Sequence, residues 1–122
     1  QLMREDMKDN VVKDKSLEFA VRIVNLYKFL VNEQKEFVMS KQILRSGTSI
    51  GANIREAEQA QSRADFINKL NIALKEANET EYWLELLIRT EYITREQYES
   101  INNDSTEINK LLISIIKTTK NN

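Results

Sequence analysis

The chain contains no cysteine, no histidine and no proline, and only two of its 122 residues are glycine. Without cysteine it forms no disulfide, uses no thiolate nucleophile and offers no sulfur ligand to zinc. Without histidine it lacks the most common general base and the most common metal ligand. With no proline to break a helix and little glycine for hairpin turns, helices are favoured over sheets. These absences indicate an all-α protein that is not an enzyme and has no cofactor or metal.

Neither sign of charge dominates, since the net charge is −1. The charges are nevertheless unevenly placed: residues 10–55 carry eight Lys and Arg against four Asp and Glu, and residues 56–109 carry five against twelve. Residues 110–122 carry three lysines and no acid. The basic segments can neutralise the acidic one within a bundle or between subunits, or they can bind phosphates.

Long apolar runs are also missing. No run approaches the roughly 18 residues that a membrane-spanning helix requires, and the charged N-terminal residues do not resemble a signal peptide. We therefore expect a cytoplasmic protein with no membrane partner.

The length is that of one domain, and we expect a flexible arm over residues 1–12 followed by a bundle domain over residues 13–122.

Apolar residues recur every three or four positions and predict four helices, at 14–32, 40–61, 63–91 and 95–119. Because the connections are short, the predicted fold is all-α, an antiparallel up-down-up-down four-helix bundle. The predicted core positions of the last two helices are Phe66, Leu70, Ala73, Ala77, Leu84, Leu87, Ile88, Tyr98, Ile101, Ser105, Ile108, Leu112, Ile115 and Thr119. The predicted N-caps are Asp14 or Ser16, Ser40, Ser62, and a capping box of Thr94 with Gln97.

The two glycines, Gly47 and Gly51, lie four residues apart inside the second predicted helix. Each costs roughly 1 kcal/mol relative to alanine in a helix interior. Close approach of another helix would explain that cost. The residues predicted to allow close helix packing are Gly47, Gly51, Ser46, Ser49 and Asn53.

The first predicted helix has more apolar surface than one bundle core needs. Its apolar residues span an arc of about 220°, whereas a helix facing one core needs roughly 100–140°. The third predicted helix also carries apolar residues outside its core positions. We therefore predict a homo-oligomer in the form of a ring, with the following interface residues: Ile72, Tyr82, Trp83, Leu86, Phe19, Ile23 and Leu26. The alternatives for Tyr82 and Trp83 are a place in the core or stacking on a single-stranded nucleic acid.

Candidate catalytic groups do not converge. The second and third predicted helices carry Glu56, Glu58, Glu76, Glu79, Glu81 and Glu85. A di-iron bundle site would need Glu-x-x-His pairs, so we interpret these carboxylates as partners of Arg45, Arg55 or Lys75. The segment from Gly47 to Gly51 lacks the preceding strand and the Gly-Lys-Ser/Thr ending of a phosphate-binding loop. No residue is therefore assigned to catalysis, cofactor or metal.

Three segments carry a resemblance to a known family: Arg45-Ser-Gly-Thr-Ser-Ile-Gly-Ala-Asn-Ile-Arg-Glu-Ala57, Gln61-Ser-Arg-Ala-Asp-Phe66 and Lys75-Glu-Ala-Asn-Glu-Thr-Glu-Tyr-Trp-Leu84. Together they resemble the bacterial four-helix bundle proteins encoded in intervening sequences of 23S ribosomal RNA genes, a ribosomal-protein-like family. The resemblance implies an antiparallel four-helix bundle that assembles as a homopentamer, and it supplies no catalytic residue. A related branch, the accessory variability determinant of diversity-generating retroelements, binds nucleic acid through a strongly basic surface. This chain departs from that branch in its net charge of −1.

Two functions follow as hypotheses. The first is a non-enzymatic oligomeric scaffold or partner-binding module, whose partner is itself or another protein. The second is an RNA-associated accessory protein with a modest basic surface over residues 13–55 and Lys110, Lys117 and Lys120. Its candidate nucleic-acid contacts are Lys41, Arg45 and Arg55. The hypotheses differ in whether the basic residues of the first two helices cluster on an exposed face or pair with the acidic third helix.

Overall fold

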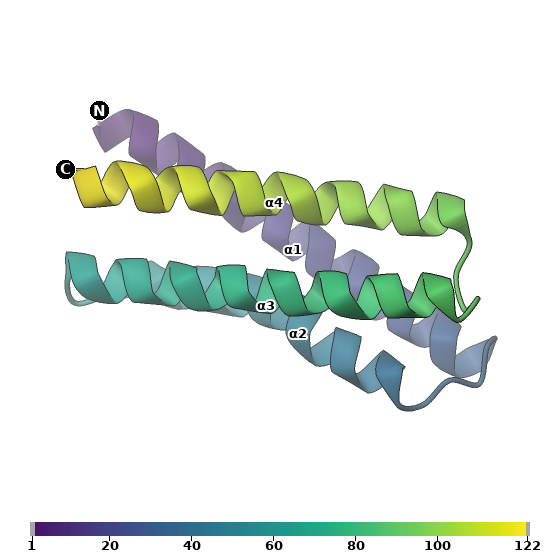
Figure 1. The fold of residues 1–122 in the computed structure, drawn as a ribbon. Coiled ribbons are helices and arrows are strands. Elements are labelled where there is room, and N and C mark those ends of the chain that lie inside the picture. The colour runs from purple at the N-terminus through teal and green to yellow at the C-terminus, as the bar shows by residue number, and fades with distance from the viewer. Residues whose placement is uncertain (1, 122) are drawn as a thin grey trace.

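The computed structural model describes residues 2–121, with side chains from residue 9 onward, and this part of the chain has four α-helices and no strand. The helices are α1 (Leu2–Asn32), α2 (Met39–Ala57), α3 (Arg63–Arg89) and α4 (Arg95–Asn121). The predicted all-α chain of four helices is confirmed over these residues (Figure 1).

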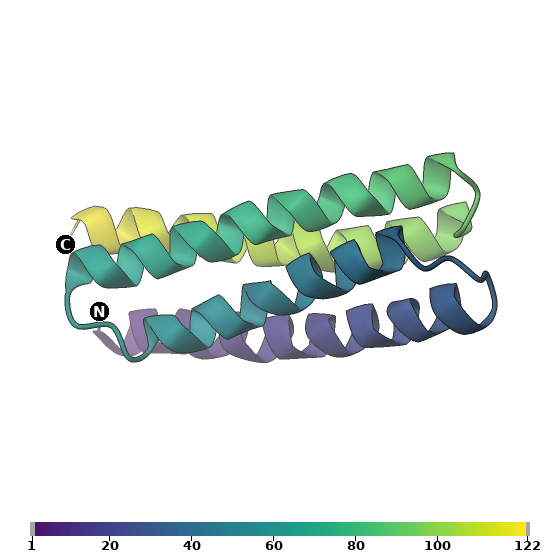
Figure 2. The ribbon, with the colours of Figure 1, turned by 90° about the horizontal axis from the view of Figure 1, so that it is seen from below.

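Each helix packs against two others. The contacting pairs in the described chain are α1–α2, α2–α3, α3–α4 and α1–α4, so the helices surround one core. Both ends of the chain lie at the same end of the molecule (Figures 1 and 2). The α1–α4 pair, which joins the first helix to the last, is the most sparsely packed of the four.

The core is made of one apolar stripe from each helix. In α4 the buried residues are Ile101, Ser105, Ile108, Leu112, Ile115 and Ile116, of which all but Ile116 were predicted from the spacing. In α3 they are Leu70, Ala73, Ala77, Thr80, Leu84 and Leu87, with Phe66 and Ile88 packed at the edge. Each fully buried Leu or Ile contributes roughly 1.5–3 kcal/mol, so these stripes hold the four helices together.

Two of the predicted helix starts have the expected caps. At α3 the Ser62 side chain accepts a hydrogen bond from the Asp65 backbone amide at 3.1 Å. At α4 Thr94 and Gln97 form a reciprocal capping box: Gln97 Oε1 accepts from the Thr94 amide at 2.8 Å, and Thr94 Oγ1 accepts from the Gln97 amide at 3.1 Å. Both patterns are local in sequence, which is why they were recognisable there.

The start of the first helix differs from the prediction. α1 begins at Leu2, so Asp14 and Ser16 lie inside it and do not cap it. Val12 is buried, and the Ser16 hydroxyl donates to the carbonyl of Lys13, an intrahelical contact. Residues 2–12 are therefore part of α1, whereas a flexible arm was predicted over residues 1–12; Gln1 lies outside the described residues.

The second helix also begins differently. It runs from Met39 to Ala57, shorter than the predicted 40–61, and Ser40 is not its cap. Instead the nearly buried carboxylate of Glu36 accepts hydrogen bonds from three backbone amides, those of Val38 (3.1 Å), Met39 (3.0 Å) and Ser40 (2.7 Å). A carboxylate is favoured here because the free amides and dipole of a helix N-terminus attract negative charge.

Candidate functional site

The two glycines lie where α2 approaches α1. A Cβ atom placed on Gly47 would lie 2.7–3.0 Å from three side-chain atoms of Ile23. A Cβ on Gly51 would lie 3.3 Å from the hydroxyl oxygen of Ser16 and 3.4 Å from its carbonyl oxygen. At both glycines, therefore, α2 lies close to α1 of the same chain.

The small polar residues near the glycines face α3 or bond within α2. The buried hydroxyls of Ser46 and Thr80 lie 2.9 Å apart, and the Thr80 hydroxyl is 2.8 Å from the carbonyl oxygen of Glu76. Ser49 donates to the carbonyl of Arg45, and the Asn53 amide donates to the carbonyl of Ser49. Ser46 thus contributes to the α2–α3 contact, whereas Ser49 and Asn53 make bonds to their own helix.

Arg45, a candidate nucleic-acid contact, is engaged with the acidic third helix. Its guanidinium lies 3.3 Å from each carboxylate oxygen of Glu76 and also hydrogen bonds to the carboxylate of Glu79. Glu79 in addition accepts from the indole nitrogen of Trp83 at 3.3 Å. The hydrogen bond from Arg45, with a smaller contribution from Trp83, holds the pKa of Glu79 below its ordinary value, and the same pairing raises the pKa of Arg45.

Other basic residues pair with acids of a neighbouring helix. The interhelical ion pairs are Lys13–Glu58 (3.1 Å), Lys15–Glu107 (3.0 Å), Arg22–Asp104 (2.7 Å) and Lys69–Glu56 (3.0 Å). Lys41 and Arg55 are exposed and have no ion pair within the described chain. Of the eight basic residues at 13–55, four are therefore paired with acids of the bundle, namely Lys13, Lys15, Arg22 and Arg45.

Two of the predicted interface residues need correction. Phe19 and Ile23 are fully buried in the core of their own chain, so they leave no surface for a second copy. Their position follows from the glycine contact, because Ile23 fills the space above Gly47. Leu26 is partly buried against the same core.

The predicted interface residues of α3 differ in how deeply their side chains are buried. Trp83 is partly buried against the core, and Ile72 and Leu86 are half-buried. Tyr82 is 58% exposed and meets the Trp83 ring edge to face, with ring centroids 5.0 Å apart. The alternative of a place in the core therefore fits Trp83, which packs against the core, and does not fit the exposed Tyr82.

The apolar surface of α1 that remains uncovered lies elsewhere. Leu17 is 50% exposed and Val21 is 55% exposed, one turn apart, and Val11 is also exposed. Leu17 and Val21 belong to the broad apolar pattern of the first predicted helix, whereas Val11 lies in the predicted arm. The width of that pattern indicated an excess of apolar surface, but the sequence did not separate the buried side from the exposed one.

One further carboxylate faces another helix. Glu81 Oε2 accepts hydrogen bonds from the buried Ser105 hydroxyl at 3.0 Å and from the Asn109 side-chain amide at 2.7 Å, which joins α3 to α4. Among the described residues no group of three or more acidic side chains is arranged to hold a metal ion. Glu76, Glu79 and Glu81 of α3 therefore contact neighbouring helices, whereas Glu85 pairs with Arg89 of its own helix.

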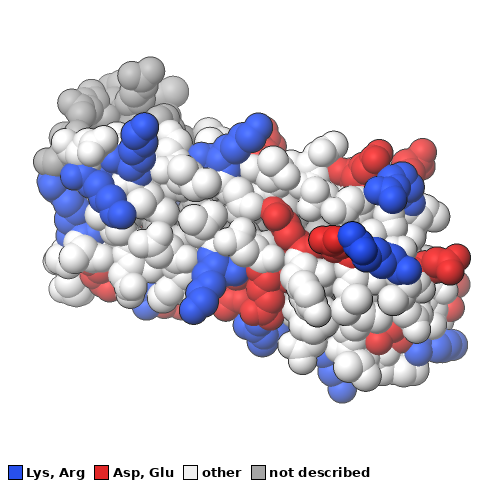
Figure 3. Space-filling view, viewed as in Figure 1, with Lys and Arg blue, Asp and Glu red and all other residues white. Residues whose placement is uncertain are grey.

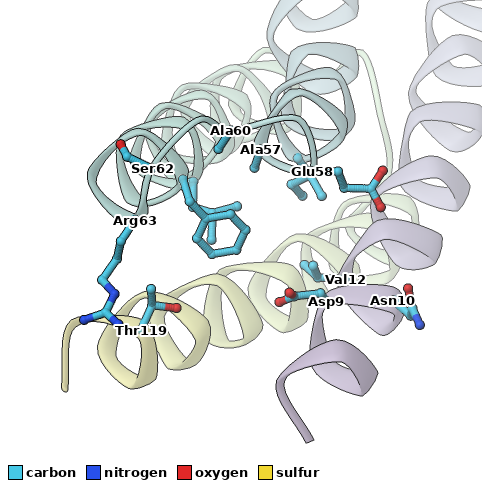
Figure 4. A pocket seen from close by; sticks show the side chains of 12 residues that line it. Asp9, Asn10, Val12, Ala57, Glu58, Ala60, Ser62, Arg63 and Thr119 are labelled. Atoms are coloured by element: carbon cyan, nitrogen blue, oxygen red, sulfur yellow. The ribbon is translucent and has the colours of Figure 1, made fainter. Parts of the chain in front are cut away.

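A cavity of about 630 Å³ opens at the end of the bundle where the two chain ends lie. Its floor is apolar, and its polar lining comes from all four helices or their connections (Figure 4). Arg63 lies beside Thr119 on one side, and Glu58 and Asn10 lie on the other. The charged groups are thus spread around the opening and do not converge on one point.

No helix within residues 2–121 combines the length and the apolar character that a membrane crossing demands.

Comparison with curated proteins finds no match. A crystal structure from Bacteroides thetaiotaomicron, described as a protein of unknown function from the S23 ribosomal protein family, is 98% identical. The similarity covers 92% of this chain and 96% of that one, with a TM-score of 0.88. The model of the 23S rRNA-intervening sequence protein family matches residues 8–114. The chain therefore belongs to the 23S rRNA-intervening sequence protein family.

Proposed function

We propose that this protein is a non-enzymatic cytoplasmic scaffold that assembles from identical copies. The observation that carries the proposal is the uncovered apolar surface of α1, where Leu17 and Val21 are each about half exposed on successive turns. Apolar surface of this kind on a small bundle usually marks a contact with another protein. The similar solved protein is described as having unknown function, so no known activity argues against a binding role.

The proposed architecture is an up-down-up-down bundle in a closed ring. Support for alternating helix directions comes from the contacts between consecutive helices and from the short connections at residues 33–38, 58–62 and 90–94. Most soluble homo-oligomers have closed symmetry, which favours a ring. The number five comes from the family resemblance alone.

Size-exclusion chromatography with light scattering tests this proposal. The wild-type protein at micromolar concentration should have the mass of an oligomer, and Leu17→Ser with Val21→Ser should shift it toward the monomer while circular dichroism stays helical. The matched control is Phe37→Ser with Val38→Ser, which removes apolar side chains that are at least as exposed from the connection before α2. A wild-type monomer would refute the scaffold, and an oligomer of another size would refute only the number five.

A second candidate function is association with RNA. It is favoured by Lys110, Lys117 and Lys120 of α4, which are exposed and have no ion pair among the described residues. Lys41 and Arg55 add two more uncompensated charges on α2. Against it stands the net charge of −1, because non-specific affinity for RNA depends on the number of phosphates neutralised.

A further inference from the structure

We propose that copies of this chain meet head to tail, with an acidic strip on α1 of one copy seated in a basic groove beside α4 of the next. The α1 strip consists of Asp14, Leu17, Glu18 and Val21. The α4 groove is lined by Leu74, Ile113, Lys117 and Lys120, and Lys110 lies beside it on α4. The inference rests on the proposed function, since it names the surfaces through which the scaffold would assemble.

The α1 strip is a single exposed face of the helix. Its residues are spaced by three, four and seven positions, which places them side by side over two turns, and all four are exposed. Asp14 and Glu18 take part in no ion pair among the described residues. The adjacent Lys13 and Lys15 are already paired with Glu58 and Glu107. The strip therefore presents two apolar side chains flanked by two carboxylates that form no ion pair among the described residues, and Lys15 is the cation with which Glu18 interacts electrostatically.

The α4 groove has the opposite charge. It is a shallow cavity of about 350 Å³ between α3 and α4, lined by Asn71, Leu74, Ile113, Ile116, Lys117, Lys120 and Asn121. Ile113 is 54% exposed at its edge, and Lys110 lies one turn before it on the same side. In Figure 3 most basic side chains at the left end of this face lie over the C-terminal half of α4, and most acidic ones lie farther right.

A second copy explains both surfaces together. Each has an apolar centre with charges of one sign around it, and the two signs are opposite, so the surfaces complement one another. RNA would neutralise the lysines but would leave Ile113 and the α1 strip uncovered. Because the two surfaces differ, the contact is heterologous, and such contacts repeat around a ring when the rotation closes.

Charge reversal tests the pairing in the full chain. One variant carries Asp14→Lys and Glu18→Lys, a second carries Lys110→Glu and Lys117→Glu, and a third carries all four changes. Each of the first two places like charges opposite each other, and the apparent dissociation constant should rise at least about tenfold. The third restores opposite charges and should recover the wild-type mass. Light scattering measures mass, and circular dichroism melting verifies that each variant is folded.

The matched control reverses Glu33 and Glu91 to lysine in the connections at the other end of the bundle, where the mass should not change. If the wild-type protein is an oligomer and both reversal variants keep its mass, the inference fails and the scaffold stands. If both variants dissociate and the third does not recover, the two surfaces do not pair with each other. If lysine reversal removes RNA binding without changing the mass, the groove belongs to RNA. A monomeric wild-type protein would overturn both proposals.

Discussion

At the scale of single residues, Gly47 and Gly51 look equivalent in the sequence but have different neighbours. Gly47→Ala should lower the free energy of unfolding by up to about 2 kcal/mol, because overpacking of a core costs about 1–3 kcal/mol and the gain in helix propensity is only about 1 kcal/mol. The atoms in the way belong to Ile23, which is fully buried and stiff near its backbone. Urea unfolding followed by circular dichroism measures the change.

Gly51→Ala is the natural comparison. Its nearest neighbour would be the Ser16 hydroxyl at 3.3 Å, a contact that a shift of a few tenths of an ångström relieves. The gain in helix propensity then offsets most of the cost, and the stability should stay within about 0.5 kcal/mol of wild type. Equal losses for the two variants would show that the approach of Ile23 to Gly47 is not tight.

Glu36 is the residue whose removal should most affect the start of α2. Glu36→Ala leaves three backbone amides without their acceptor, and loss of a cap costs about 0.5–2 kcal/mol. Ser40→Ala should cost less, because the buried Ser40 hydroxyl has no hydrogen-bond partner among the described residues. Thermal melts of the two variants show which one loses more stability. A larger loss of stability for Ser40→Ala would contradict this account.

These residues show where prediction from sequence ends. Ser62 and the Thr94–Gln97 pair cap their helices through contacts three residues apart, which a sequence pattern displays directly. Glu36 lies outside its helix and reaches the amides with a side chain folded over the connection. These contacts span only two to four residues and are equally local, but Ser is preferred at an N-cap and Glu is not, so the pattern pointed to Ser40 instead.

At the scale of helices, the Arg45 contact with Glu79 connects α2 to α3 and gives stability a pH dependence. Arg45 lowers the pKa of Glu79 in the folded chain from its ordinary value of 4.5. At pH values between the folded-state pKa and 4.5, the unfolded chain therefore binds more protons than the folded chain. The contribution of the Arg45–Glu79 pair to the free energy of unfolding is therefore complete above about pH 4.5. It is lost as the pH falls through the lower pKa that Glu79 has in the folded chain. It should remain below about 1 kcal/mol, since the pair is partly exposed and screened.

Glu79→Gln tests this contribution. The variant should lose less unfolding free energy than wild type when the pH falls below 4.5, as measured by urea titration at several pH values. Glu99→Gln serves as the control, because Glu99 is exposed and has no ion pair in the described part of the chain. Parallel pH profiles for wild type and Glu79→Gln would rule out the pairing as a source of acid sensitivity.

Prediction worked best for helices with one narrow apolar stripe. The positions from Ile101 to Ile115 of α4 alternate by three and four, and the structure buries them as expected. In α1 the apolar positions cover an arc of about 220°, wider than one core needs, so several assignments of its inner side fit the pattern equally well. The actual one depends on Gly47, whose missing side chain admits Ile23 and leaves Leu17 and Val21 outside.

At the scale of the whole molecule, the distribution of charge limits the affinity for nucleic acid. We expect a dissociation constant no tighter than about 1 μM for RNA near physiological salt, with affinity falling as salt rises, because few phosphate contacts are available. Fluorescence anisotropy with labelled RNA at two salt concentrations measures it. Nanomolar binding that disappears in Lys41→Glu with Arg55→Glu would favour the RNA-associated function.

The sparse α1–α4 contact has a consequence for how the chain folds and opens. Three of the four helix pairs are neighbours in sequence and form with short loop closures, whereas α1 and α4 meet only when almost the whole chain is closed on itself. Across that contact Lys15 pairs with Glu107, and Arg22 pairs with Asp104 and hydrogen bonds to Ser100. The last contact to form is thus also the least densely packed, and native-state fluctuations should separate α1 from α4 while α2 and α3 remain together.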